Sequence, residues 1–226
     1  MQHDMQWKHM QIGEGTKLSR WLNLDVMNFP GVGKYNIPEL DAATECNASD
    51  WLEFSQAVGD RRVDWKRAKT GVHFFQYDGL FERCWSDPAR YAEIMLKYNC
   101  VLSPDFSMFT DFPLAVNIFN HYRKHWIAKY WQDDFGINII PTICWSDESS
   151  FEWCFDGEPK HSIVAVSNVG CIKNKEHHKS FLRGYEEMLN RLEPTMVLCY
   201  SRKIMDYPGN VKYIKFSAFK RRINEE

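Results

Sequence analysis

The chain has 226 residues, of which 44% are apolar and 15% aromatic, which is enough for one sizeable packed domain or two small ones. Its formal net charge of −2 gives no overall attraction to nucleic acid or to a membrane surface, although local basic clusters can still act. No run of ~18 apolar residues is present, which argues against a membrane-spanning helix. The polar start, MQHDMQWKHMQ, lacks the apolar core of a signal peptide.

The seven cysteines are scattered along the chain without a C-x-x-C pair. This spacing argues against a zinc site built from thiolates. Several cysteines lie within apolar segments, where a free thiol packs as a small hydrophobic group. The pattern indicates a reduced, cytosolic protein.

Residues 1–70 show the least regular pattern. Trp21–Met27 is a candidate strand, and residues 29–40, FPGVGKYNIPEL, form a loop rich in proline and glycine. Trp51–Ala57 follows Ser49 and Asp50, which are good N-cap residues, so this segment is either a helix or an alternating strand.

From residue 70 onward, strands alternate with helices. Strands are predicted over Val72–Asp78, Cys100–Ser107, Ile137–Trp145, Ser162–Asn168, Thr195–Ser201 and Val211–Ser217. Helices are predicted over Leu80–Tyr98, Pro113–Gln132 and Lys175–Leu192, with a short one over Glu148–Phe155.

The helix over Pro113–Gln132 carries an apolar side and a polar side. The apolar residues at helical spacing are Leu114, Ile118, Phe119, Tyr122, Trp126 and Tyr130, and they are predicted to be buried. The polar side carries Asn117, His121, Lys124 and His125, and it is predicted to face solvent. The spacing of His121 and His125 suits zinc, but the glutamate of H-E-x-x-H is missing, which favours the solvated interpretation.

The alternation predicts an α/β fold with a mostly parallel sheet covered by helices. The strands read as continuous apolar runs, as expected when both faces of a parallel sheet are buried. If both uncertain N-terminal segments are strands, the count reaches about eight and a TIM-barrel-like fold, incomplete or irregular, becomes plausible. Otherwise the sheet is open. We expect a single β/α domain over residues 21–217, an N-terminal extension over 1–20 and a charged tail over 218–226.

Polar residues follow the predicted strands where each one ends. Ligands of parallel β/α folds bind at the carboxyl ends of the strands, so these residues are the candidate site. They are Tyr77 and Asp78, Asp105, then Trp145, Asp147 and Glu148, then Ser167 and Asn168, and finally Tyr200.

Carboxylates at successive strand ends suggest two kinds of chemistry. Asp78, Asp105 and Asp147 could hold a divalent metal ion such as Mg²⁺ or Mn²⁺, because hard cations take oxygen ligands. Two carboxylates could instead act as general acid and base on a glycosidic bond. The structural alternative is that each carboxylate caps the helix that follows it.

The segment SNVGCIKNK leads from a strand through a glycine loop into a helix, with Lys173 and Lys175 beside it. Backbone N–H groups and the helix N-terminus there could bind a phosphate or carboxylate. The alternative is an ordinary loop with solvated lysines. Trp145 could stack on a sugar or base, or could pack at the rim of the sheet. The C-terminal KYIKFSAFKRR could contact phosphates, or could be an edge strand protected by lysines.

Four blocks occur in order along the chain: FFQYDGLFERCW, VLSPDFSMFTDFPLAVNIFNHYR, IIPTICWSDESSFEWCFDGEPKHSIVAVSNVGCIKNK and FLRGYEEMLNRLEPTMVLCYS. With GKYNIPEL nearer the start, they resemble the family named domain of unknown function 4417, over about Gly31–Phe216. That family occurs in bacteria, prophages, phages and plasmids, so the resemblance implies a cytosolic protein of a bacterial cell or mobile element. It brings no established activity. It also favours a strand over Trp51–Ala57.

Three classes of function remain open at this point. The first is a hydrolase of phosphodiesters or glycosides built on Asp78, Asp105 and Asp147 or Glu148, in which Lys173 stabilises developing negative charge. The second is a non-catalytic binding protein for nucleic acid or a host protein, suggested by the aromatic content, the basic tail and the phage context. The third is an assembly component of a phage particle or replication complex. The sequence does not decide whether the protein is an enzyme.

Overall fold

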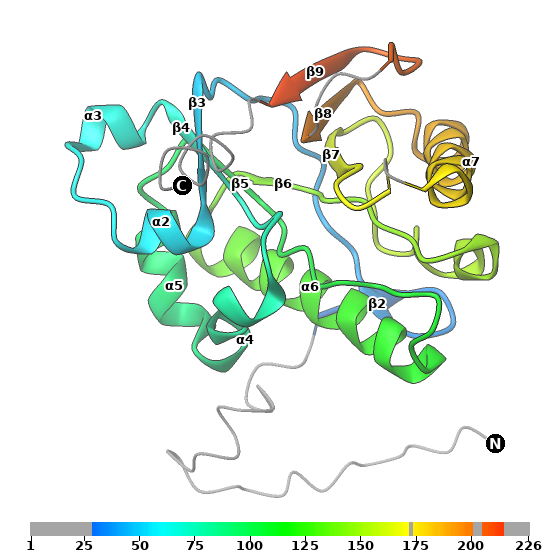
Figure 1. The fold of residues 1–226 in the computed structure, drawn as a ribbon. Coiled ribbons are helices and arrows are strands. Elements are labelled where there is room, and N and C mark those ends of the chain that lie inside the picture. Colours follow the sequence, from blue (N-terminus) through cyan, green and yellow to red (C-terminus); the bar gives the residue numbers. More distant parts are fainter. Residues whose placement is uncertain (1–28, 172–173, 201–204, 215–226) are drawn as a thin grey trace, which may run out of the picture.

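A computed structural model describes residues 29–171, 174–200 and 205–214 (Figure 1). The strands are β1 (Gly31–Val32), β2 (Ile37–Pro38), β3 (Asp50–Glu53), β4 (Thr70–His73), β5 (Cys100–Leu102), β6 (Ile139–Ile140), β7 (Ile163–Ser167), β8 (Met196–Tyr200) and β9 (Val211–Ile214). The helices are α2 (Phe54–Val58), α3 (Asp64–Arg67), α4 (Arg83–Ser86), α5 (Pro88–Met95), α6 (Leu114–Phe135) and α7 (Lys175–Leu192), with 3₁₀ turns η2 (Asp78–Leu80) and η3 (Glu148–Glu152).

The protein is a mixed α/β structure with two parallel sheets. One sheet has the order β3-β4-β5-β6 and the other β7-β8-β9, so neighbouring strands follow one another in sequence. A parallel bridge between Thr142 and Ala165 connects the two sheets just after β6. Strands β1 and β2 form a separate antiparallel pair. Across the described residues, the strand series is not closed, because no pairing joins β3 to β9.

An inner apolar cluster connects both parallel sheets. Successive side chains of a strand point to opposite faces, so Leu198 and Tyr200 of β8 enter this cluster whereas Val197 and Cys199 face the other way. The inner cluster also contains Trp51, Cys100, Leu102, Ile140, Ile163, Ala165 and Ile214. Tyr200 packs there against His73, with ring centroids 4.5 Å apart, so the first sheet meets the second on this side.

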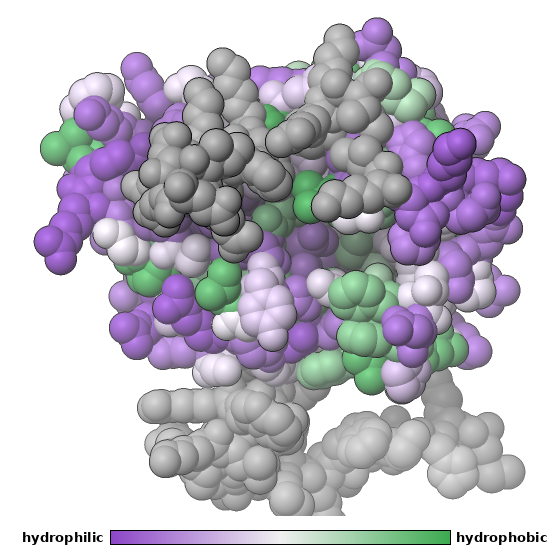
Figure 2. All heavy atoms as spheres, in the orientation of Figure 1, coloured by the Kyte–Doolittle hydropathy of each residue, from purple (hydrophilic) through white to green (hydrophobic). Residues whose placement is uncertain are grey.

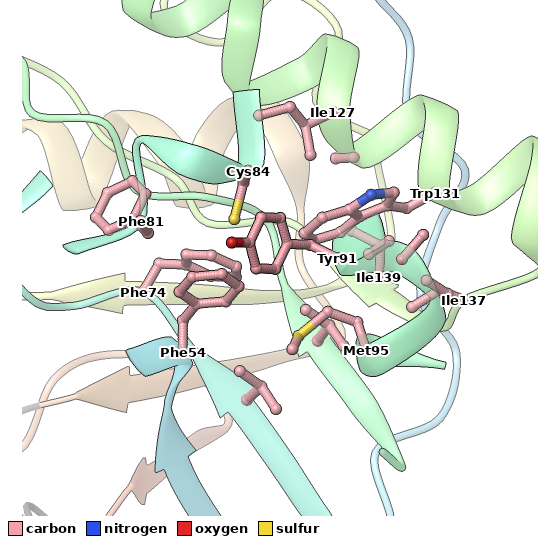
Figure 3. Close-up of a cluster of buried hydrophobic side chains, with 14 of the residues drawn as sticks. Phe54, Phe74, Phe81, Cys84, Tyr91, Met95, Ile127, Trp131, Ile137 and Ile139 are labelled. Carbon is pink, nitrogen blue, oxygen red and sulfur yellow. The ribbon is translucent and has the colours of Figure 1, made fainter. Parts of the chain in front are cut away.

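Helices cover the outer faces of both sheets. Helices α2, α4, α5 and α6 lie against β3–β6, and α7 lies against β7–β9 (Figure 1). The outer core of the first sheet is aromatic: Phe54 and Phe74 stack with ring centroids 5.0 Å apart, and Tyr91 and Trp131 lie beside them (Figure 3). Burial of such side chains contributes roughly 1.5–3 kcal/mol each and supplies most of the drive for folding.

The predicted alternation of strands and helices from residue 70 onward is confirmed, with shorter strands than expected. The uncertain segment Trp51–Ala57 contains both alternatives, because β3 ends at Glu53 and α2 begins at Phe54. The candidate strand Trp21–Met27 lies outside the described residues. The seven cysteines are free thiols. Among the described residues, none of the helices has the length and hydropathy of a membrane span.

The prediction of which side of α6 is buried was wrong for its first half. Leu114 and Phe119, expected inside, are 54% and 44% exposed, whereas His121, Lys124 and His125 are at most 1% exposed. The polar side of the helix turns inward because buried polar partners are available for it there, as described below. Leu114, Val116 and Phe119 are left exposed, and Figure 2 shows an apolar area over that end of α6.

Candidate functional site

A cleft of about 450 Å³ opens at the carboxyl ends of β5, β6 and β7. Its lining includes Asp105, Ser107, Cys144, Trp145, Ser167 and His177. Asp105, Trp145 and Ser167 come from three different strand ends that the sequence had singled out. The structure therefore brings together part of the predicted site, at the place where parallel α/β folds bind ligands.

Asp105 is the acidic group among the described residues that line this cleft. Burial of the carboxyl group raises its pKa to about 6. The Lys124 ammonium opposes this rise, and the Asp78 carboxylate adds to it. A hydrogen bond with Cys144 lowers the pKa, in the opposite direction to burial. A carboxyl that titrates near neutral pH can both accept and donate a proton under physiological conditions. The environment of Asp105 is thus suited to general acid–base chemistry.

The loop that carries Asp105 is held in place from two sides. Asp78 at the start of η2 accepts hydrogen bonds from the backbone N–H and the hydroxyl of Ser107, at 2.9 and 2.8 Å. Asn120 of α6 donates to the Ser107 carbonyl at 2.7 Å, and Asn117 donates to the Phe109 carbonyl at 2.8 Å. Asp78 therefore orients the cleft loop, and the inward polar side of α6 fixes the other side of that loop.

Trp145 forms a wall of the cleft by packing on α7. Its ring centroid lies 5.4 Å from that of Phe181. A Cβ atom at Gly184 would lie 2.2 Å from the indole, so the close approach of Trp145 to the helix requires glycine at this position. The indole is fixed by packing and still contributes to the lining of the cleft.

Asp147 and Glu148 do not line this cleft. Asp147 caps η3 by accepting a hydrogen bond from the Ser149 N–H at 2.9 Å. Glu148 forms an ion pair with Arg183 of α7 and lines a separate groove between η3 and α7, which also includes Arg191. In the described part of the chain, Asp78, Asp105 and Asp147 do not come together as a set of metal ligands.

The remaining predicted binding residues lie in different surroundings. Asn168 is buried and donates to the Tyr207 hydroxyl at 2.7 Å, whereas Tyr200 belongs to the inner core. Tyr77 is 79% exposed, away from the cleft lining, and Lys175 is an exposed first residue of α7. Lys173 lies outside the described residues.

The N-terminus of α7 is oriented by its cap. The Asn174 side chain accepts hydrogen bonds from the N–H groups of Glu176 and His177, at 2.8 and 3.3 Å. His177 and Ser180 of the first turns line the cleft. The positive end of the helix dipole therefore lies beside the space into which Asp105 and Trp145 face.

A second polar cluster lies buried beneath α6, and it can hold a metal ion. His121, His125 and Glu158 offer ligand atoms that all lie within 4.8 Å of one another. Glu158 Oε1 lies 2.6 Å from Lys124 Nζ and 3.0 Å from His125 Nε2. Lys124 also donates to the Thr142 carbonyl at 2.9 Å, which connects this cluster to the end of β6.

Burial and charge set the protonation states of this cluster. Burial would raise the pKa of Glu158, but the Lys124 ammonium in direct contact with it lowers the pKa, so the side chain is a carboxylate. Burial would lower the pKa of Lys124, but the surrounding acidic groups, with Glu158 in direct contact, raise it. Burial lowers the pKa of both His121 and His125, so their rings are neutral at neutral pH.

Sequence reasoning missed Lys124 and Glu158 as inward-facing groups. One signal was available: Asn117, Asn120, His121 and Lys124 recur at spacings of three and four, which is as regular as the apolar set on the opposite side of α6. Glu158, in contrast, follows a turn at Gly157 and has no periodic pattern around it. No pattern in the sequence indicates that Glu158 pairs with Lys124.

The fold and cleft define an α/β protein with a partly enclosed polar site at the ends of parallel strands. The family model described as domain of unknown function (DUF4417) matches residues 29–220, and the chain belongs to this family. The Gene 1 protein of Mycobacterium phage D29 is 35% identical over 179 residues, which cover 78% of this chain and 64% of that protein.

The Gene 1 protein of Mycobacterium phage L5 is also 35% identical over 179 residues, covering 78% of this chain and 75% of its own length. The chain thus matches just under two thirds of the D29 protein. No solved structure matches the chain. The comparisons show a phage-associated family whose function is unknown.

Proposed function

We propose that the protein is a hydrolase whose active site is the cleft at the ends of β5, β6 and β7, with Asp105 as general acid or base. The observation that carries this proposal is the position of the Asp105 carboxyl in the cleft, where burial raises its pKa to about 6. General acid–base catalysis by a positioned side chain typically contributes a factor of about 10²–10⁴ in rate.

The composition of the cleft favours a phosphodiester over a glycoside as substrate. Glycosidases use two carboxyl groups on either side of the scissile bond, but among the described residues Asp105 is the one carboxylate in the cleft lining. His177 and the N-terminus of α7 lie beside the same space and favour a negatively charged group. Trp145 offers a planar surface for a base, and Lys173, whose position is not described, is the candidate for stabilising developing charge.

The sheet arrangement supports a finer interpretation of the fold. We infer that β3 to β9 form an incomplete, irregular TIM-barrel-like structure. Support comes from the sequential strand order, the bridge between Thr142 and Ala165, and the inner cluster to which both sheets contribute. In such folds the active site lies at the carboxyl ends of the strands, which is where the cleft opens. The phage relatives support action in the cytoplasm of a bacterial host cell.

A substrate panel tests the proposal. The panel consists of bis(p-nitrophenyl) phosphate, single-stranded and duplex DNA, RNA and p-nitrophenyl glycosides, each with and without Mg²⁺, Mn²⁺ or Zn²⁺. Asp105→Asn is expected to lower the phosphodiester rate at least about 100-fold. Asp111→Asn is the matched control, because it removes the same charge from an exposed position just beyond the cleft loop. Equal rates in Asp105→Asn and wild type would refute the assignment.

A non-catalytic binding function is the second candidate, with nucleic acid or a host protein as partner or an assembly role in a phage complex. The observation that favours it is an exposed apolar area beside the cleft, formed by Phe109, Phe112, Leu114, Val116 and Phe119. In the panel, salt-sensitive binding of DNA or RNA without turnover would support this candidate. Self-association on size-exclusion chromatography that is lost in Phe119→Ser would support an assembly role.

A further inference from the structure

We propose that His121, His125 and Glu158 bind a transition-metal ion, with Zn²⁺ as the first candidate, at a buried site beneath α6. This inference does not depend on the proposed hydrolase activity. It also places the metal away from the aspartates at the strand ends. The cluster is formed by side chains on successive turns of α6 and by the turn that carries Gly157 and Glu158.

The hydrogen bonds of the two histidines determine which nitrogens are free. A backbone carbonyl can only accept, so the Asp156 carbonyl, 3.0 Å from His121 Nε2, requires a proton on that nitrogen. The Pro38 carbonyl, 2.9 Å from His125 Nδ1, likewise requires a proton on Nδ1. In the neutral rings, the lone pairs are then on His121 Nδ1 and His125 Nε2.

Metal-ligating histidines characteristically show this arrangement. The ring nitrogen that does not bind the metal donates to a backbone carbonyl or a carboxylate, which fixes the tautomer and the ring orientation. Both histidines meet this condition with backbone carbonyls. The two rings lie on successive turns of one helix with centroids 4.5 Å apart, and one nitrogen of each ring and one oxygen of Glu158 all lie within 4.8 Å of one another.

Glu158 completes the ligand set, and its two oxygens have different roles. Oε1 receives a hydrogen bond from Lys124 at 2.6 Å, whereas Oε2 is buried and receives none from any described residue. His121 Nδ1 is also buried, and no described residue donates to it. Two buried acceptors without donors destabilise the folded protein, and a bound cation would remove that cost.

A third acceptor contact points to the same place. His125 Nε2 lies 3.0 Å from Glu158 Oε1, and with the tautomer set by Pro38 both atoms carry lone pairs. Such a contact is repulsive unless a proton or a metal ion lies between the two atoms. His121 Nδ1, His125 Nε2 and Glu158 Oε2 are therefore three acceptors that receive no hydrogen bond from the part of the chain that the structure describes, where Lys124 donates to Glu158 Oε1.

The backbone is shaped around this cluster. Gly157 has φ +77°, and a Cβ atom there would lie 2.5 Å from the Pro38 carbonyl oxygen and 2.8 Å from His125 Nδ1. Glycine thus permits the turn that brings Glu158 to His125 and the carbonyl of Asp156 to His121. The N–H of Leu40 donates to the Gly157 carbonyl at 2.9 Å, which anchors the turn to the segment after β2.

The donor set selects the metal. Two imidazole nitrogens and one carboxylate oxygen form a set known for Zn²⁺ and for Fe²⁺, whereas Mg²⁺ and Ca²⁺ require a shell of oxygens. The Lys124 ammonium repels a cation, which disfavours an ion attracted to the cluster only by the charge of Glu158. It disfavours less a metal ion that also forms bonds with imidazole nitrogens. Tetrahedral Zn²⁺ places its ligand atoms about 3.4 Å apart, so the three ligand atoms, which lie within 4.8 Å of one another, would move closer together when the ion binds.

Metal analysis of the full chain tests the inference. The protein is purified without chelator and without a histidine tag, and zinc and iron are measured by mass spectrometry. We expect about one metal ion per chain in wild type, and a large loss in His121→Asn and Glu158→Gln. His161→Asn is the matched control, because His161 is exposed and lies outside the cluster, and it should keep the metal.

Two measurements on wild type keep the test valid if the variants do not fold. Addition of Zn²⁺ to chelator-treated protein, at ~100 times its dissociation constant, should raise the melting temperature by about 5–10 °C. X-ray absorption of the zinc-loaded protein should show imidazole nitrogens at about 2.0–2.1 Å. If the protein is purified without metal and its melting temperature does not respond to Zn²⁺, Fe²⁺ or Co²⁺, the inference is wrong. In that case a shared proton lies between His125 and Glu158 in place of a metal ion.

Discussion

The Nζ atom of Lys124 lies 2.6 Å from the Oε1 atom of Glu158, and both side chains are almost completely buried. A buried ion pair of this kind is strongly coupled, because removal of one partner leaves the other charge in a medium of low dielectric constant. The pair also lies between two parts of the molecule. Lys124 reaches the Thr142 carbonyl at the end of β6, and Glu158 reaches His125 on α6.

Removal of the lysine charge should destabilise the fold strongly. We expect Lys124→Met to lower the free energy of unfolding by about 3–5 kcal/mol, measured by urea denaturation at pH 7. Lys129→Met is the control on the same helix, since Lys129 pairs with the exposed carboxylates of Asp41 and Asp133. Its loss should cost no more than about 1 kcal/mol. Equal effects of the two substitutions would show that the buried pair does not stabilise the fold.

The pKa of Asp105 should be visible in the pH dependence of stability. Its folded pKa of about 6 lies above the ordinary value of 3.8, so the folded state binds the proton more tightly. The stability from this group is therefore complete below about pH 4 and is lost as the pH rises through about 6.

Asp105→Asn carries a neutral group at every pH, so it avoids that loss. The variant should be more stable than wild type by about 1–3 kcal/mol at pH 8, and the difference should shrink toward pH 4. The measurement is the free energy of unfolding of both proteins at several pH values. A difference that does not change between pH 4 and 8 would contradict the raised pKa.

Gly157 should tolerate substitution far less well than another glycine with a similar backbone. Gly157 and Gly136 have φ values of +77° and +63°, so both are strained by a side chain. At Gly136 an added Cβ meets nothing within 4 Å, whereas at Gly157 it meets the Pro38 carbonyl oxygen at 2.5 Å.

Gly136→Ala should therefore cost about 1–2 kcal/mol, the penalty of the left-handed conformation. Gly157→Ala should cost about 1–3 kcal/mol more, because the backbone must also move. Thermal unfolding of both variants gives the comparison. If Gly157→Ala costs no more stability than Gly136→Ala, the turn before Glu158 has room for a side chain at position 157.

Cys46 should be the most reactive thiol among the described residues. A hydrogen bond from Cys100 lowers its pKa to about 6, burial opposes this change, and the Ala48 N–H and the Lys212 charge assist it. The two sulfur atoms lie 3.9 Å apart. At pH 7 the thiolate of Cys46 should dominate, and the thiolate is the form that reacts.

Iodoacetamide labelling followed by peptide mass spectrometry measures this reactivity. Cys171 is the comparison, because it is also partly exposed but burial raises its pKa. Cys46 should be alkylated before Cys171 at pH 7, and the ratio of the two alkylation rates should fall in Cys100→Ala. Equal labelling of Cys46 and Cys171 would contradict the lowered pKa.

The sequence predicted those elements whose pattern is complete within a short window. Helix α7 was predicted over Lys175–Leu192 and has the same bounds, since its apolar spacing is regular and Pro194 follows its end. The strand predicted over Cys100–Ser107 is shorter, because β5 ends at Leu102. There the Ser103 hydroxyl accepts from the Thr142 N–H at 2.8 Å, and the chain leaves the regular ladder.

The candidate site was predictable only in part. Asp105, Trp145 and Ser167 line one cleft, and the sequence indicated that they would lie close together because strand ends of a parallel sheet lie at one edge. The burial of the polar side of α6 was not predictable from the sequence. A helix that carries both a regular apolar stripe and a regular polar stripe does not show which of the two faces inward. Its inward stripe is satisfied by Glu158, Thr142 and the loop at Ser107, and these contacts depend on tertiary structure.

A pH–rate profile distinguishes acid–base catalysis by Asp105 in the strand-end cleft from a purely structural role of this carboxyl group. The measurement is kcat/KM of wild type and Asp105→Asn between pH 4.5 and 8.5, on the phosphodiester that the panel identifies. We expect an inflection near pH 6 in wild type, from the raised pKa of Asp105. In Asp105→Asn the rate should be at least about 100-fold lower and the inflection absent. A variant that keeps both the rate and the inflection would show that Asp105 is not the acid–base group.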